Sequence, residues 1–288
     1  MTEAGQRPLA WITGAGGLIG NYLVQTAAAS QPGWRVAGLT RQELDLLDFA
    51  AVRRRFAAER PALVIHCAAL SQSVACQARP DLARQINVEA TRHLAELASD
   101  CRFVFFSTDL VFDGRQGYYA EDATVNPLSV YGETKAAAEA IVARHPRALV
   151  IRTSLNGGRS PTGDRGFNEQ LRRAWQAGQT ARLFTDEFRC PIAAVETARA
   201  VWELVGLGLT GLVHVAGGER LSRWRIGQLL AARWPQLHPR IEVASLREYT
   251  GAPRPPDTSL NCARAEAALG RPMPRFTDWL AAHADEPF

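Results

Sequence analysis

Residues 9–20 read Leu9-Ala10-Trp11-Ile12-Thr13-Gly14-Ala15-Gly16-Gly17-Leu18-Ile19-Gly20. The first five residues are a short apolar run that predicts a buried strand. A glycine-rich turn follows, then a helix expected over residues 21–29 and a second strand over 35–40. The order strand, glycine-rich turn, helix, strand is typical of the start of a dinucleotide-binding βαβ unit.

The glycines stand at Gly14, Gly17 and Gly20, one residue away from the Gly-x-Gly-x-x-Gly spacing. Glycine permits a tight turn and lets backbone N–H groups approach a pyrophosphate at the helix N-terminus. We therefore expect this turn to bind a dinucleotide cofactor.

The end of the second strand predicts which cofactor is used. An acidic residue there would accept a hydrogen bond from the ribose 2′-hydroxyl of NAD, but this strand ends Leu39-Thr40-Arg41. Because Arg41 can pair with a 2′-phosphate, the sequence favours NADP. Glu43 lies close enough that NAD remains an alternative.

Further apolar strands are expected at residues 62–69, 102–106 and 148–152. A wholly apolar strand is typical of a buried parallel sheet, so the fold class is α/β with a doubly wound parallel sheet. Ala68 and Ala69 end one strand with small side chains, which leaves room for a flat cofactor. Thr108 and Asp109 follow another strand, where ligands bind in such sheets.

The regular alternation of strands and helices stops after residue 155. We expect a nucleotide-binding domain over 8–155, completed by 190–218, and a smaller substrate-binding cap built from 156–189 and 219–288. Helices are expected at 167–177, 193–207, 221–232, 263–269 and 277–284, a strand at 212–216, and an irregular proline-rich segment at 235–256.

One lysine occurs among the 33 Lys and Arg residues, and it is Lys135. It lies four residues after Tyr131, so the two side chains share one face of the expected helix. A compact ammonium beside a phenol favours the phenolate, which predicts a lowered pKa for Tyr131.

Composition narrows the class of protein. The net charge of +4 without a basic run gives no reason to expect a nucleic-acid partner. The five cysteines are scattered and odd in number, which favours reduced thiols and a cytoplasmic location. No apolar run approaches the length of a membrane span. His66 has no second ligand at metal-binding spacing, so a structural role is expected.

Taken together, these motifs resemble the extended short-chain dehydrogenase/reductase family and, within it, the dTDP-4-dehydrorhamnose reductases. The resemblance covers nearly the whole chain and rests on the following segments: Thr13-Gly14-x-x-Gly17-x-x-Gly20, Asp45-Leu46, Cys67-Ala68-Ala69, Asn87, residues 107–114, Tyr131-x-x-x-Lys135, Arg152-Thr153-Ser154, residues 186–191 and residues 254–260.

The resemblance implies a role for each matching position. Thr108, Tyr131 and Lys135 would form the catalytic set, with Tyr131 as proton donor to a ketone. Thr108, Asp109 and Arg254 would contact a sugar-nucleotide substrate. Tyr131 and Lys135 would also bind the cofactor, with Lys135 on the nicotinamide ribose hydroxyls. The other cofactor-binding positions would be Gly14, Gly17, Leu18, Ile19 and Gly20 around the pyrophosphate, Arg41, Asp45 and Leu46 around the adenosine, and Ala68 and Ala69 beside the nicotinamide.

Two departures lie where the sugar nucleotide would be held. Leu155 stands where these reductases carry an aromatic residue, and residues 187–191 read Glu-Phe-Arg-Cys-Pro instead of Gln-x-x-x-Pro. The leading expectation is an NAD(P)H-dependent reductase of a 4-keto-6-deoxy sugar nucleotide, with a homodimer as an open expectation. The alternatives are a non-catalytic NADP-binding regulatory subunit, similar to the methionine adenosyltransferase β-subunit, and a sugar-nucleotide epimerase or dehydratase.

Overall fold

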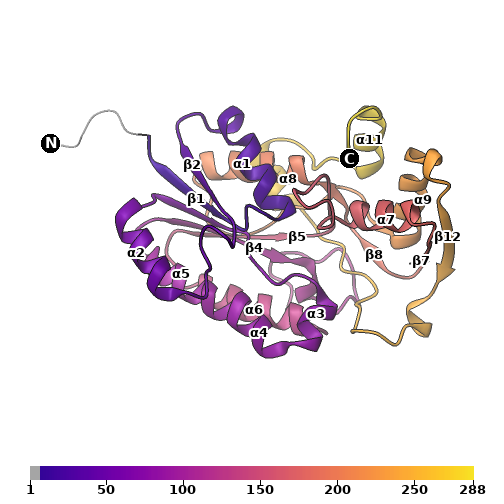
Figure 1. Ribbon diagram of the computed structural model, residues 1–288, viewed down its shortest axis with the longest axis horizontal. Coiled ribbons are helices and arrows are strands. Elements are labelled where there is room, and N and C mark those ends of the chain that lie inside the picture. The colour runs from indigo at the N-terminus through magenta and orange to yellow at the C-terminus, as the bar shows by residue number, and fades with distance from the viewer. Residues whose placement is uncertain (1–6) are drawn as a thin grey trace.

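A central parallel sheet organises the computed structural model, which describes residues 7–288 (Figure 1). The strand order is β2-β1-β3-β4-β5-β10, and every neighbouring pair is parallel. The strands are β1 (Leu9–Thr13), β2 (Arg35–Leu39), β3 (Leu63–His66), β4 (Arg102–Thr108), β5 (Ala148–Thr153) and β10 (Gly211–His214). The predicted α/β fold with a doubly wound parallel sheet is confirmed.

Helices cover both faces of this sheet (Figure 1). Successive strand residues point to opposite faces, so Ile12 packs toward one layer and Trp11 toward the other. One layer contains α1 (Leu18–Ser30), α8 (Ala194–Gly206) and α10 (Ala263–Leu269). The other contains α2 (Phe49–Glu59), α5 (Ala90–Leu97) and α6 (Val130–Val142). Asp48 and Ser129 cap α2 and α6 by accepting backbone N–H groups with their side chains.

The sheet order reverses between β1 and β3. The loop after β1 holds the glycines, and the loop after β3 holds Cys67, Ala68 and Ala69. In open α/β sheets, ligands bind in the crevice at such a reversal. The topology therefore places both predicted cofactor-binding loops at one crevice.

The second half of the chain adds short strand pairs with their own core. In it, β7 (Thr180–Phe184) pairs in parallel with β12 (Arg240–Ala244), and β8 (Phe188–Arg189) pairs antiparallel with β11 (Leu221–Ser222). Helices α7 (Phe167–Gln176), α9 (Arg223–Arg233) and α11 (Phe276–Ala282) pack around a third hydrophobic cluster that includes Trp175 and Trp234. We refer to this part as the cap. It lies at the opposite end of the molecule from β2 (Figure 1).

Several element boundaries differ from those expected. The first helix begins at Leu18, directly after the glycine turn, and not at Asn21. The segment 235–256 was expected to be irregular, but it contains β12, because strand β7 offers it a partner from 60 residues earlier. The helical segment before β4 has three parts, which are α4 (Pro80–Arg84), a π-helical turn η1 (Gln85–Glu89) and α5.

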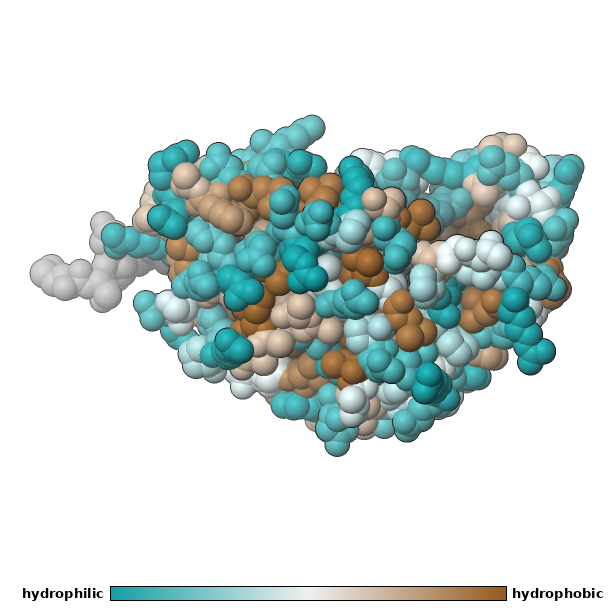
Figure 2. Space-filling view, turned by 90° about the horizontal axis from the view of Figure 1, so that it is seen from below, coloured by the Kyte–Doolittle hydropathy of each residue, from teal (hydrophilic) through white to brown (hydrophobic). Residues whose placement is uncertain are grey.

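The remaining elements are short. They are α3 (Ser73–Ala78), β6 (Asn156–Gly157), β9 (Ile192–Ala193), and the 3₁₀ turns η2 (Asp109–Val111), η3 (Pro235–Leu237) and η4 (Leu246–Glu248). Figure 2 shows the molecule from below, on the side where α2, α4, α5 and α6 lie in Figure 1. Hydrophobic residues on this surface are interspersed with hydrophilic ones. Among the described residues, no helix has the length and hydropathy needed to span a bilayer.

Candidate active site

A cleft of about 660 Å³ opens at the carboxyl edge of the sheet and extends to the cap. This volume is in the range that holds small-molecule ligands and cofactors. All predicted site residues line it except Arg254. The sheet side contributes Gly14, Gly17, Leu18, Ile19, Gly20, Arg41, Asp45, Leu46, Ala68, Ala69, Ser107, Thr108, Asp109, Tyr131 and Lys135, and the cap side contributes Leu155, Arg165, Phe167, Arg189 and Arg223 among others.

The glycine turn is packed too closely for side chains. Gly14 has a φ of +71°, and a Cβ there would lie 2.7 Å from the backbone nitrogen of Ala68. A Cβ on Gly20 would lie 2.4 Å from the carbonyl oxygen of Gly14. Helix α1 begins here without a side-chain cap and without an acidic residue in its first turn. Its free N–H groups and positive dipole end therefore form an anion-binding site that opens into the cleft.

Two charged residues, Arg41 and Glu43, follow the end of β2, and the acid is already hydrogen-bonded to the protein. Arg41 Nη2 lies 3.5 Å from Asp45 Oδ2, and both side chains are largely exposed. Glu43 instead accepts the Thr40 backbone N–H at 2.8 Å, and this hydrogen bond lowers its pKa. Glu43 does not line the cleft, whereas Arg41, Asp45 and Leu46 do.

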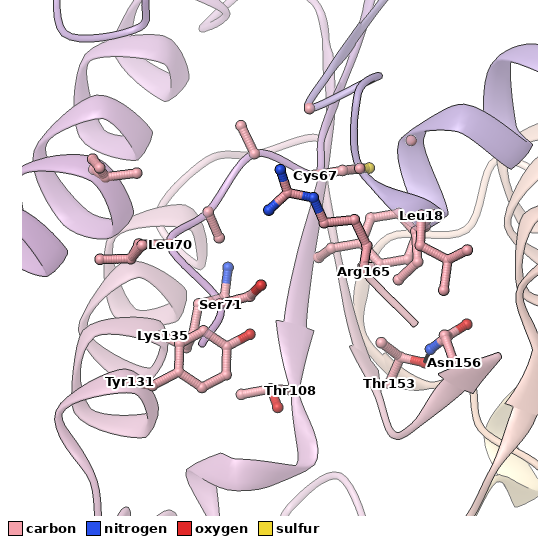
Figure 3. Close-up of a pocket in the computed structure, with 18 of the residues that line it drawn as sticks. Leu18, Cys67, Leu70, Ser71, Thr108, Tyr131, Lys135, Thr153, Asn156 and Arg165 are labelled. Atoms are coloured by element: carbon pink, nitrogen blue, oxygen red, sulfur yellow. Dashed lines mark hydrogen bonds between the residues drawn. The ribbon is translucent and has the colours of Figure 1, made fainter. Parts of the chain in front are cut away.

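Tyr131 and Lys135 project from the first two turns of α6 toward the cleft, opposite Thr108 at the end of β4 (Figure 3). Lys135 is 2% exposed, and its Nζ lies 3.9 Å from the centroid of the Phe105 ring. Burial lowers the pKa of Lys135 to about 7, although the charge of Glu139 opposes this shift.

The predicted direction of the Tyr131 pKa is wrong. Its pKa is raised, first by burial and then by the nearby carboxylate of Asp109, while a hydrogen bond with Thr108 opposes the change. The ammonium of Lys135 faces the Phe105 ring. A phenol with a raised pKa keeps its proton at neutral pH, so Tyr131 carries its hydroxyl proton in the cofactor-free chain.

Asp109 is buried at the centre of a polar network. Its Oδ2 accepts hydrogen bonds from Ser154 Oγ at 2.7 Å and Thr258 Oγ1 at 2.9 Å, and Arg189 Nε lies 3.7 Å away. Its Oδ1 accepts from Thr108 Oγ1 at 3.2 Å. The carboxylate is therefore held by protein groups, and it orients Thr108 at the edge of the cleft.

A second buried carboxylate, Glu187, joins two arginines behind the cleft. It is 2% exposed and lies 3.1 Å from Arg189 Nη2 and 3.2 Å from Arg254 Nη1. Arg254 also lies over the Tyr249 ring, 5.1 Å from its centroid. The structure thus places Arg254 outside the cleft lining, where it pairs with Glu187, the residue that precedes β8.

Arg223, Arg165 and Ser107 are among the cleft residues that had no role in the sequence analysis. Arg223 lines the cleft over the Phe167 ring, and no ion pair or hydrogen bond to its guanidinium exists within residues 7–288. Arg165 also lines the cleft, and the hydroxyl of Ser107 is buried there without a hydrogen-bond partner. The arginines carry no sequence signal in a chain with 32 of them, and Ser107 could have been found only from its position at a strand end.

Asn87 connects two sides of the site. Its amide accepts the Leu70 backbone N–H at 2.8 Å and donates to Thr134 Oγ1 at 3.0 Å. The loop after β3 is thereby fixed to α6, the helix that carries Tyr131. His66 is buried between Thr13 and Thr91, with hydrogen bonds of 2.7 and 3.0 Å that occupy both ring nitrogens.

The residues present fit a dinucleotide cofactor. The glycine turn forms a backbone cradle at the helix N-terminus, and the buried Ser107 hydroxyl gives an unsatisfied polar group further along the cleft. Such a group costs free energy unless a ligand or water satisfies it. Both features line the same cleft, so a single ligand that fills it can meet both.

Residues 10–287 match the family model described as the RmlD substrate binding domain. A probable low-salt glycan biosynthesis reductase of Haloferax volcanii is 31% identical and covers 95% of this chain and 96% of that protein. The dTDP-4-dehydrorhamnose reductase of Mycolicibacterium smegmatis is 32% identical, over 95% and 83%. A methionine adenosyltransferase 2 subunit beta from Xenopus laevis is 26% identical, over 89% and 81%.

Solved structures show the same fold. A dTDP-4-dehydrorhamnose reductase from Clostridium acetobutylicum has a TM-score of 0.87 and 25% identity, with 96% of this chain and 98% of that chain covered. A dTDP-4-dehydrorhamnose reductase from Bacillus anthracis, solved in complex with NADP, has a TM-score of 0.88 at 23% identity, with the same coverage.

Proposed function

The chain belongs to the RmlD substrate binding domain family, within the extended short-chain dehydrogenase/reductases, and from this membership we propose a specific reaction. It is the NADPH-dependent reduction of a 4-keto-6-deoxy sugar nucleotide. The observation that carries the proposal is Tyr131, a half-buried phenol that lines one cleft together with Thr108, Lys135 and the glycine turn.

Reduction of a ketone needs a hydride on carbon and a proton on oxygen. When bound, a reduced nicotinamide supplies the hydride. Tyr131 Oη donates the proton to the keto oxygen. Thr108 donates its single hydroxyl proton to Asp109 in the ligand-free chain, and it turns that proton to the keto oxygen as a second hydrogen bond when the substrate binds. Positioned proton donors of this kind contribute roughly 10²–10⁴-fold in rate.

Lys135 would bind the nicotinamide ribose hydroxyls. Its pKa of about 7 in the cofactor-free chain means that protonation is balanced near neutral pH. Hydroxyl oxygens accept hydrogen bonds from an ammonium and favour its charged form. Cofactor binding should therefore raise the pKa of Lys135.

Charge on the cap side supports an anionic substrate. Arg189 is neutralised by Asp109 and Glu187, whereas the guanidinium of Arg223 faces the cleft with no such partner within the described chain. A nucleoside diphosphate sugar carries charges that this arginine can meet with charge-assisted hydrogen bonds. The curated relatives include a dTDP-4-dehydrorhamnose reductase, which supports this substrate class.

The choice of NADPH rests on Arg41. It lines the cleft at the end of β2, and Glu43, the acid closest to it in sequence, is engaged by Thr40. The relative from Bacillus anthracis was solved with NADP, which supports the same choice.

A second candidate function is a non-catalytic NADP-binding subunit. The similarity to methionine adenosyltransferase 2 subunit beta favours it, because that relative aligns with most of this chain. A regulatory subunit would bind NADP through the same glycine turn and Arg41. It would not require Tyr131 to transfer a proton.

Turnover separates these candidates. The purified chain is mixed with NADPH and dTDP-4-keto-6-deoxyglucose, and the loss of reduced-nicotinamide absorbance is followed. A reductase consumes NADPH in proportion to added keto sugar. Tight NADPH binding with no consumption across a panel of 4-keto sugar nucleotides would favour the regulatory role, and NAD retained through purification would favour an epimerase or dehydratase.

A further inference from the structure

We propose that Arg165 binds the diphosphate of the dinucleotide cofactor from the cap side of the cleft. This inference rests on the proposed function, since it presumes that a dinucleotide occupies the glycine turn. It assigns a cofactor contact to a part of the chain that was expected to bind only the substrate.

The loop that carries Arg165 is fixed by a buried carboxylate. Glu169, on the first turn of α7, is 6% exposed and accepts four hydrogen bonds from residues 160–166. The donors are the Ser160 backbone N–H at 2.7 Å, the Ser160 hydroxyl at 2.8 Å, the Arg165 backbone N–H at 2.9 Å and the Gly166 backbone N–H at 2.8 Å. The backbone at Arg165 is thereby held in one position relative to α7.

The same loop rests on the helix that begins at the glycine turn. The Arg159 backbone N–H donates to Tyr22 Oη on α1 at 3.1 Å. A Cβ at Gly166 would lie 3.4 Å from Leu18 Cδ2, so this peptide touches the first residue of α1. Arg165 is consequently anchored next to the helix N-terminus that would bind a pyrophosphate.

The side chain of Arg165 extends into the cleft toward Cys67, on the far side from its own loop (Figure 3). Its Nε lies 3.2 Å from Asp164 Oδ1 and 3.3 Å from Thr162 Oγ1. Within residues 7–288 no partner engages the two terminal amino groups, so they can donate to a ligand.

Both carboxylates of this loop are already engaged by the protein. Asp164 also pairs with Arg173 at 3.6 Å, and Glu169 accepts the four hydrogen bonds given above. The dipole of α1 adds partial positive charge at its N-terminus. A diphosphate would meet this helix end and the free amino groups of Arg165, and an arginine can hold two of its oxygens at once. The partnerless, buried Ser107 hydroxyl in the same cleft independently indicates a ligand there.

The experiment measures dissociation constants by titration calorimetry for wild type, Arg165→Ala, Arg165→Lys and Arg159→Ala. Arg159 is the matched control, because it lies in the same loop and its side chain does not line the cleft. The ligands are NADPH, NADH, ADP-ribose, adenosine 2′-monophosphate and dTDP. Circular dichroism checks that each variant is folded.

We expect Arg165→Ala to weaken NADPH, NADH and ADP-ribose alike by about tenfold, the lower end for a hydrogen bond to a charged group. Adenosine 2′-monophosphate and dTDP should bind as before, Arg165→Lys should keep part of the affinity, and Arg159→Ala should change nothing. Unchanged ADP-ribose affinity in Arg165→Ala would overturn the proposal. Weakened dTDP with unchanged ADP-ribose would overturn it too, by assigning the arginine to the substrate. A wild-type chain that binds none of the dinucleotides would instead reject the proposed function.

Discussion

The sheet half and the cap form their parts of the site from different kinds of contact. On the sheet side, the glycine turn, Tyr131 and Lys135 occupy positions fixed by a strand end or a helix turn close by in sequence. On the cap side, Arg189 and Glu187 are held by Asp109 and Arg254, which are distant in the chain. The chemistry of the first half therefore follows from local backbone geometry, and that of the second from buried charges brought together by the fold.

The largest effect is expected at the proton donor of the sheet half. Tyr131→Phe removes the phenol hydroxyl and keeps the ring, so turnover should fall by roughly 10²–10⁴-fold. NADPH affinity should stay nearly unchanged. Steady-state NADPH oxidation with a 4-keto-6-deoxy sugar nucleotide measures the first quantity, and fluorescence titration measures the second.

Tyr118→Phe is the control for that variant, because Tyr118 is 63% exposed and lies before α6. It should retain full activity. Wild-type turnover that survives Tyr131→Phe would show that another group donates the proton, and the role assigned to α6 would have to be given up.

The next effect tests whether buried charge holds the cap together. Glu187→Gln removes the carboxylate shared by Arg189 and Arg254. Because Asp109 still faces Arg189 and Arg254 is partly exposed, the loss in unfolding free energy should be about 1.5–3 kcal/mol, the range for hydrogen bonds to charged groups. Urea denaturation measures this change. The control is Glu248→Gln, whose pair with Arg182 is exposed and should contribute less than about 1 kcal/mol. Equal stability of the two variants would contradict the contrast between the halves.

Lys135, the single lysine, should make the unfolding free energy of the chain depend on pH. The pKa of Lys135 is about 7 in the folded chain and 10.5 as the ordinary value. Between pH 7 and pH 10.5, Lys135 is protonated in the unfolded chain and neutral in the folded chain. The unfolded chain therefore binds one proton more than the folded chain, so the unfolding free energy rises as the pH increases over this range. Lys135→Met should remove that rise, which amounts to roughly 1 kcal/mol per pH unit. Thermal denaturation of the cofactor-free chain from pH 7 to pH 9 compares the two slopes, and parallel slopes would show that Lys135 stays charged when buried.

Much of the sheet half could be predicted because its signals are short in range. The apolar strands, the glycine turn and the Tyr131–Lys135 spacing each depend on residues that are close in sequence, and the structure brings them to one cleft. The direction of the Tyr131 pKa was not predictable, because it depends on burial and on Asp109, which reaches Tyr131 only through the fold.

The cap was harder to predict for the same reason. Strand β12 exists because β7 pairs with it, and its own sequence, which includes a glutamate and an arginine, gives a weak signal. Arg254 was expected to contact substrate, but Glu187 and Tyr249 hold it outside the cleft lining. Arg223 and Arg165 reach the cleft through packing that no spacing encodes.

The smallest effect is expected on cofactor affinity when Arg41 is replaced. Arg41 is a charged surface residue of the sheet half that we expect to bind the cofactor. Its side chain is 78% exposed and meets Asp45 at 3.5 Å, so solvent screens its interactions. Arg41→Ala should weaken NADPH by about 1.5 kcal/mol, the lower end for a hydrogen bond to a charged group, and leave NADH nearly unchanged. Calorimetric titration of both cofactors measures the difference, with the exposed Arg54 of α2 mutated to alanine as control.

Because NADH lacks the 2′-phosphate, equal losses for both cofactors would mean that Arg41 acts on the adenosine or the loop and does not select NADPH. Another group would then have to select NADPH. The end of β2 would no longer be an example of a site in the sheet half that is set by residues close in sequence.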